Sequence, residues 1–142
     1  MADDVNAILT EFERLKQACQ EMAGKKITVG IIGGGETAKI AHIHEYGDGK
    51  MPERSFLRAS FDADQAELSN IVTGQVTKVL SGQTSAGAAA NAIGAQAAQL
   101  VQNYIDSNRV TPSSDFSKKT QHTTLYETGT HIRDRIAFKV EG

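Results

Sequence analysis

Several residue types that reinforce small proteins are scarce in this sequence. It has no Trp, two Pro and one Cys, and 6% of its 142 residues are aromatic. Because the single thiol, Cys19, has no second cysteine to pair with, we expect no disulfide within the chain, no cysteine-based zinc site and a reducing compartment. A chain of this length buries enough surface to fold without such crosslinks, so residues 1–142 are expected to form one domain.

The sequence also lacks an excess of charge of one sign. Fifteen Lys and Arg against 17 Asp and Glu leave a formal net charge of −2. No overall basic field therefore draws the protein onto nucleic acid or an anionic membrane, which argues against coating either surface. Residues 1–24 and 59–107 are each net acidic. This uneven distribution of charge along the chain suits stacking of subunits, and it is equally typical of helix faces exposed to solvent.

No apolar run has the character of a membrane span or a secretory signal. The uncharged stretch from Val79 to Ile105 contains six Asn and Gln residues, which predicts a buried or oligomer-facing helix instead. Asp3 and Asp4 stand where a signal peptide would be basic, so we expect a protein that is not exported.

The periodicity of the apolar residues predicts an α+β fold. Three- and four-residue steps indicate helices, and alternation indicates two strands that contain Ile27 and Phe138. We expect an N-terminal helix over 1–24 that is ended by a left-handed Gly24, followed by a strand over 26–32. A short helix capped by Thr37 and closed by Gly47 should come next, and then a long helix that is capped by Ser55 and runs to residue 80. A helix over 86–107 and a terminal strand over 135–140 should complete the chain. The small sheet should be mainly antiparallel, and the two long helices should pack against it as a hairpin.

Residues 106–124 form a polar segment without periodicity. A connection of this length inside a compact domain is commonly functional, or disordered in the free protein. We therefore expect it, together with the N-terminal helix, to become ordered against neighbouring proteins in an assembly.

Short motifs that suggest chemistry lack the context that the chemistry needs. Gly33 to Ala38 fits the G-x-G-x-x-A form of a dinucleotide-binding turn, but no second strand ending in an acidic residue follows. His42 and His44 stand two apart, so they diverge around a helix, and we expect two solvated histidines rather than a metal site. The Gly82 to Gly87 run is out of register for a nucleophile elbow, and the triad letters Ser113, Ser114, Asp115 and His122 share one polar loop. We expect no catalytic, cofactor-binding or metal site.

Three segments, in this order, resemble the tail-completion proteins of long-tailed double-stranded DNA phages. The first is Ala41 to Gly47 (AHIHEYG), similar to a helix that ends in an acidic residue, an aromatic and glycine. The second is Met51 to Arg58 (MPERSFLR), similar to a P-x-R-x-F-hydrophobic-R segment that leads into a long helix. The third is Leu125 to Gly129 (LYETG) and the apolar alternation up to Val140, similar to a closing T-G turn and final strand. Ser55 and Arg135 depart from the residues usual in that family.

The resemblance implies a structural subunit of the virion neck and no enzyme activity. It implies a ring, usually of six copies, between the head connector or head-closure protein and the tail terminator or tail tube, with DNA passing through the lumen without sequence-specific binding. It also implies assembly in the host cytoplasm and no membrane partner. A tail terminator or another minor tail ring protein is the alternative, because fold alone does not separate neck proteins. A small nucleotide-binding protein using Gly33 to Gly35 is a more distant one.

The segment that ends the short helix and begins the long one offers candidate interface residues. They are Tyr46, Pro52, Arg54, Phe56 and Arg58. Pro52 restrains the backbone, Phe56 can anchor the segment on an apolar surface, and the two arginines can reach a neighbour's carboxylate, with Glu45 a candidate. On this interpretation the segment contributes more to assembly than to folding. Alternatively, Phe56 and Leu57 belong to the core and both arginines are solvated.

Overall fold

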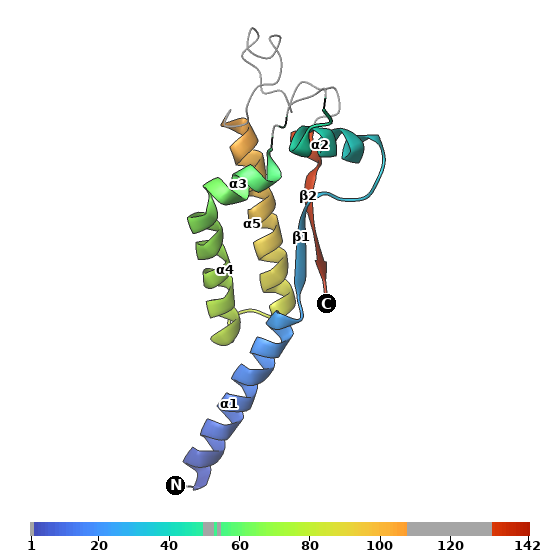
Figure 1. Ribbon diagram of the computed structural model, residues 1–142. Coiled ribbons are helices and arrows are strands. Elements are labelled where there is room, and N and C mark those ends of the chain that lie inside the picture. Colours follow the sequence, from blue (N-terminus) through green and yellow to red (C-terminus); the bar gives the residue numbers. More distant parts are fainter. Residues whose placement is uncertain (1, 50–52, 54, 108–131) are drawn as a thin grey trace.

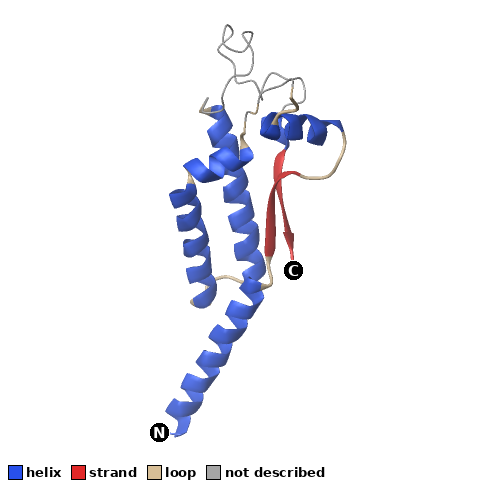
Figure 2. Ribbon diagram, in the orientation of Figure 1, coloured by secondary structure: helices blue, strands red, loops and turns tan. Residues whose placement is uncertain are grey.

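The computed structural model describes residues 2–49, 53, 55–107 and 132–142, and has the expected α+β architecture (Figures 1 and 2). In chain order the elements are α1 (Ala2–Ala23), β1 (Lys26–Ile31), α2 (Glu36–Tyr46), α3 (Leu57–Ala63), α4 (Gln65–Leu80), α5 (Ala86–Asp106), the short 3-10 helix η1 (Ile132–Arg135) and β2 (Ile136–Glu141). Most of the predicted loop 106–124, the Thr128-Gly129 turn, Pro52 and Arg54 lie outside the described residues.

Helix α5 is the centre of the molecule. It lies between α4 on one side and the β1–β2 sheet on the other, and it also contacts α3, α1 and η1 (Figure 1). Its buried face is rich in alanine, and Gly94 lies against the ring of Phe138 from β2. Small side chains let the neighbouring backbones approach closely. The prediction that α4 and α5 pack as a hairpin is confirmed.

The sheet consists of two antiparallel strands that join distant parts of the chain. Val29 pairs with Phe138, and Ile31 pairs with Ile136. In both strands the side chains on one face are buried or half-buried, and the alternate residues, such as Thr28 and Lys139, are exposed, except for Gly30, which is buried near Leu57. The alternation read from the sequence therefore describes a sheet that covers α5 with one face and meets solvent with the other.

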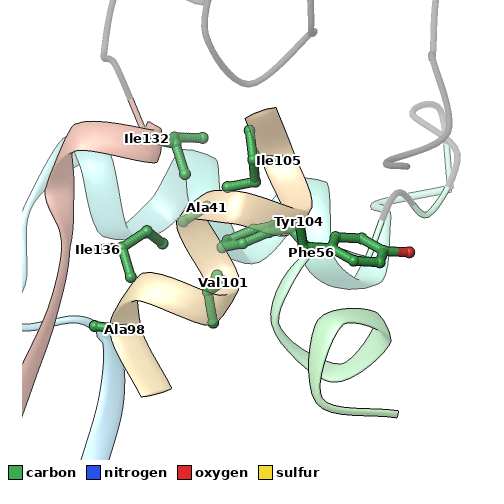
Figure 3. Close-up of a cluster of buried hydrophobic side chains, with 8 residues drawn as sticks. All are labelled: Ala41, Phe56, Ala98, Val101, Tyr104, Ile105, Ile132 and Ile136. Carbon is green, nitrogen blue, oxygen red and sulfur yellow. The ribbon is translucent and has the colours of Figure 1, made fainter. Parts of the chain in front are cut away.

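The largest cluster of buried side chains lies around the last two turns of α5. Ile105 and Val101 are fully buried there beside Phe56, with Ile132 and Ile136 closing the cluster from the C-terminal segment (Figure 3). Ala41 brings α2 onto the same cluster. The core thus ties the C-terminal segment and α5 to the junction between α2 and α3.

Two predicted helix boundaries and one predicted cap conformation are wrong. The expected helix from Ser55 to residue 80 is two helices, because Asp64 has a non-helical backbone (φ −106°, ψ 27°) and lets α3 turn towards α5 while α4 runs beside it. Helix α2 begins one residue before Thr37, after Gly35, whose φ of 100° favours glycine. Gly24 follows α1 but is not among the glycines with positive φ.

Candidate functional site

The most tightly organised polar group in the described chain is the carboxylate of Glu45, at the end of α2. Glu45 is 4% exposed, and its oxygens face the start of α3. Oε2 accepts bonds from the main-chain N–H groups of Phe56 (2.8 Å) and Leu57 (2.9 Å), and Oε1 accepts one from that of Arg58 (2.9 Å). A single side chain therefore caps a helix that begins twelve residues further along the chain.

Ser55 completes the cap. Its hydroxyl donates to Oε1 of Glu45 at 2.8 Å and accepts from the main-chain N–H of Ala59 at 3.0 Å. The first N–H groups of a helix have no partner within the helix, and here the two side chains satisfy all those from Phe56 to Ala59. Ser55 was expected to cap this helix, and it shares that role with Glu45. We call Glu45, Ser55 and the N–H groups of residues 56–59 the α2–α3 clamp.

The clamp holds Glu45 in its charged form. Burial by itself raises the pKa of a carboxyl, but the bonds from the N–H groups of Arg58, Leu57 and Phe56 and from the Ser55 hydroxyl favour the carboxylate, so the pKa of Glu45 lies below its ordinary value. Partial positive charge at the helix N-terminus acts in the same direction.

The side chain of Arg58 closes the clamp on its solvent side. Its Nε donates to Oε1 of Glu45 at 3.0 Å, and Nη2 donates to the carbonyl of Glu45 at 2.7 Å and to the carboxylate of Glu53 at 2.8 Å. The guanidinium also lies 4.4 Å from the centre of the Tyr46 ring, which in turn is 4.8 Å from the ring of His42. Arg58, Tyr46 and His42 thus form a solvent-facing row, in which the two rings are tilted by 43° to each other.

The structure sorts the five predicted interface residues into different roles. Tyr46 is 53% exposed and Arg58 about half-exposed, so both reach solvent and lie together. Phe56 is fully buried, so the expectation that it anchors a partner is corrected: it belongs to the core of its own chain (Figure 3). Pro52 and Arg54 lie outside the described residues. Arg58 reaches Glu45 of its own chain, whereas the sequence suggested a neighbour's.

A small cavity of about 200 Å³ adjoins this row. It is lined by Ile31, by Ala38, Ala41, His42, Glu45 and Tyr46 of α2, and by Phe56, Leu57 and Arg58. The part of the chain that the structure describes contains no group of three or more His, Cys, Asp or Glu residues that could hold a metal ion. His44 is 5% exposed, which corrects the expectation that both histidines of this helix are solvated.

The glycine turn after β1 does not have the surroundings of a dinucleotide site. Within the described residues β1 pairs only with β2, which is antiparallel, whereas the dinucleotide fold places a parallel strand beside the first one. The second glycine-rich run is the α4–α5 turn, where the hydroxyl of Ser85 accepts the N–H of Ala88 and caps α5. The Ser, Asp and His residues of the polar loop that were considered as a catalytic triad lie outside the described residues.

One exposed feature lies on the N-terminal half of α1. The apolar side chains of Val5, Ile8, Leu9 and Phe12 share one face of this helix and are each more than half exposed. The second half of the helix meets the α4–α5 hairpin, where Nη2 of Arg14 donates to the carbonyl of Leu80 at 2.7 Å. The sequence signal for this exposure is the length of the apolar stripe of α1, which continues for more helical turns than the end of the α4–α5 hairpin can cover.

Comparison of the chain with protein-family models, with curated proteins and with solved structures finds no match. None of the described helices is both long enough and apolar enough to cross a membrane.

Proposed function

We propose that this protein is a structural subunit of a phage virion neck, a ring-forming tail-completion protein that joins the head connector to the tail. It acts through its surfaces, without cofactor or catalysis. Its partners are copies of itself, the head connector or head-closure protein, and the tail terminator or tube, with DNA passing through the lumen. The tail terminator role remains the alternative.

The α2–α3 clamp is the observation that carries the proposal. The first two segments of the resemblance meet there: Glu45 and Tyr46 come from one, and Ser55, Phe56 and Arg58 from the other. Residues that looked like two separate short motifs form one hydrogen-bonded unit. This supports a shared structural purpose for the two segments, namely to fix the angle between α2 and α3.

The unpartnered stripe of α1 supports a subunit that functions in an assembly. Four large apolar side chains more than half exposed on one helix form a contiguous surface of the kind that marks protein–protein contacts. The row of His42, Tyr46 and Arg58 adds exposed aromatic and Arg groups, the residue types enriched where interface energy concentrates.

The experiment is removal of the protein from the phage whose genome encodes it. With the gene interrupted by a stop codon, lysates should contain DNA-filled heads and separate tails, and the wild-type gene supplied in trans should restore joined, infectious particles. A gene carrying Lys78→Ala, an exposed charge on α4 outside the clamp, should restore them equally well. Normal particles assembled without the protein would refute the proposal.

A further inference from the structure

The N-terminal half of α1 is a projecting arm. Every described side chain from Asp4 to Glu13 is exposed, and the arm extends away from the α4–α5 turn with the N-terminus at its far end (Figure 1). Val5, Ile8, Leu9 and Phe12 recur at three- and four-residue steps, so they form one stripe along it. Nothing in the described chain covers this stripe.

A second uncovered apolar surface lies at the opposite end of the molecule. Helix α2 and the turn before it form a shallow, mostly apolar groove lined by Gly34, Gly35, Ala38, Lys39, His42 and Ile43. Ile32 beside it is 42% exposed. A β-carbon built on Gly33, Gly34 or Gly35 would meet no atom within 4 Å, so the turn is open. We call this surface the α2 groove.

We propose that the arm of one copy packs into the α2 groove of the next copy. Arm and groove cannot meet within one chain, because α1 projects from one end of the body and α2 lies at the other (Figure 1). Among the described residues seven large apolar side chains are exposed; four lie on the arm, and two, Ile32 and Tyr46, lie at the α2 end. The arm and the α2 end of the molecule therefore carry six of the seven exposed large apolar side chains among the described residues.

Charge favours this pairing over pairing of two arms. Residues 2–13 contain Asp3, Asp4, Glu11 and Glu13 and no Lys, Arg or His, and of these acidic residues Glu11 is paired with Arg14 of its own helix at 2.6 Å. The α2 groove has Lys39 and His42 on its wall and no acidic residue among those that line it. Two arms side by side would bring acidic residues against acidic residues, whereas an arm in the groove brings them to a cation.

An arm-to-groove contact uses different surfaces on the two copies. Such a head-to-tail contact produces a ring when the rotation between copies closes, and an open filament when it does not. This contact would join neighbouring copies in the neck ring proposed above. That the contact closes a ring rather than extending a filament rests on that proposed function.

Disulfide trapping tests the contact in the full-length protein. Cys19→Ser removes the exposed native thiol. In that background one preparation carries Leu9→Cys on the arm, and a second, with a mass tag, carries His42→Cys in the groove. The two are mixed at high concentration under mild oxidation, so that even a transient contact is trapped, and the products are identified by intact mass.

The mixed arm–groove dimer should form at least ten times faster than a dimer of the arm variant with Val72→Cys, a matched control on an exposed apolar residue of α4. Adding Phe12→Asp to the arm variant should reduce the rate to that of the control. Mixed dimers no faster than the control would overturn the proposal. So would arm–arm dimers in excess, which would mean that arms pair with each other.

The outcome is separable from that of the proposed function. Arm–groove trapping in a protein that the phage does not need for joining heads to tails would refute the neck role and leave the contact standing. A protein that the phage needs, but whose arm and groove do not crosslink, would keep the neck role and refute the contact.

Discussion

Replacing Glu45 with Gln tests whether the α2–α3 clamp stabilises the fold. Gln has the same size but carries one acceptor oxygen and an NH₂ group where the carboxylate has two oxygens. If the amide oxygen takes the place of Oε1, the NH₂ group faces the N–H groups of Phe56 and Leu57, which bond at 2.8 and 2.9 Å in the wild type. Two donors then lose their acceptor. With the amide reversed, Ser55 and Arg58 lose theirs.

The expected cost follows from those donors. A buried donor left without a partner costs about 1–3 kcal/mol, and two donors lose their acceptor here, whereas the half-exposed Arg58 can be solvated. We therefore expect Glu45→Gln to lower the free energy of unfolding by about 2–4 kcal/mol. In urea, with a slope near 2 kcal/mol/M, the midpoint should fall by about 1–2 M. Circular dichroism during urea titration measures it.

Glu53→Gln is the matched control. Glu53 accepts from Nη2 of the same Arg58 at 2.8 Å, but its side chain is 56% exposed. The same chemical change at this exposed pair should alter the free energy of unfolding by no more than about 0.5 kcal/mol. If the two variants shift the urea midpoint equally, the carboxylate of Glu45 does not hold α2 to α3, and the reasoning is wrong.

Three further predictions follow from the same structure. The pKa of Glu45 in the folded chain lies below its ordinary value of 4.5, so the unfolded chain binds more protons just below that pH. The wild type should therefore lose stability as the pH falls from about 4.5 through the pKa of the folded state, and Glu45→Gln should lose less. Urea unfolding at a series of pH values measures both. Gly94→Ala would place a β-carbon into the ring of Phe138, which would have to shift, and should cost about 1–3 kcal/mol in urea unfolding. Gly74→Ala, in open space, should instead gain about 0.5–1 kcal/mol, and equal effects of the two substitutions would contradict the close packing of α5 on β2. Calorimetric titration of NAD or ATP should give no saturable heat from the Gly33 to Ala38 turn, and saturable binding abolished by Gly35→Val would contradict that.

The elements themselves could be predicted from the sequence because their signals are local. Alternation around Val29 and Phe138 predicted both strands, and the buried face of α5 was predicted from its small apolar residues. The break at Asp64 escaped prediction, since apolar residues recur at helical spacing on both sides of one non-helical residue.

The site was only partly predictable. Glu45 and Arg58 were linked from the sequence as a charged pair, but the pair was placed between subunits and lies within one. The bonds from Glu45 to main-chain N–H groups have no sequence signature, because every non-proline residue carries an N–H. The exposure of the arm was also hidden: an amphipathic stripe identifies the face that is to be covered, without saying whether the same chain covers it.

The sheet has a consequence for the order in which the chain folds. Its strands pair Lys26 with Glu141 and Ile31 with Ile136, partners more than 100 residues apart, while α4 and α5 are joined by a short turn. Closing a long loop costs more chain entropy than closing a short one, so the hairpin can form early and the sheet must form late. During synthesis, β1 waits for its partner until residues 136–141 have left the ribosome. Until then the face of α5 that the sheet covers is open to solvent, and so is the face of β1 that packs on it.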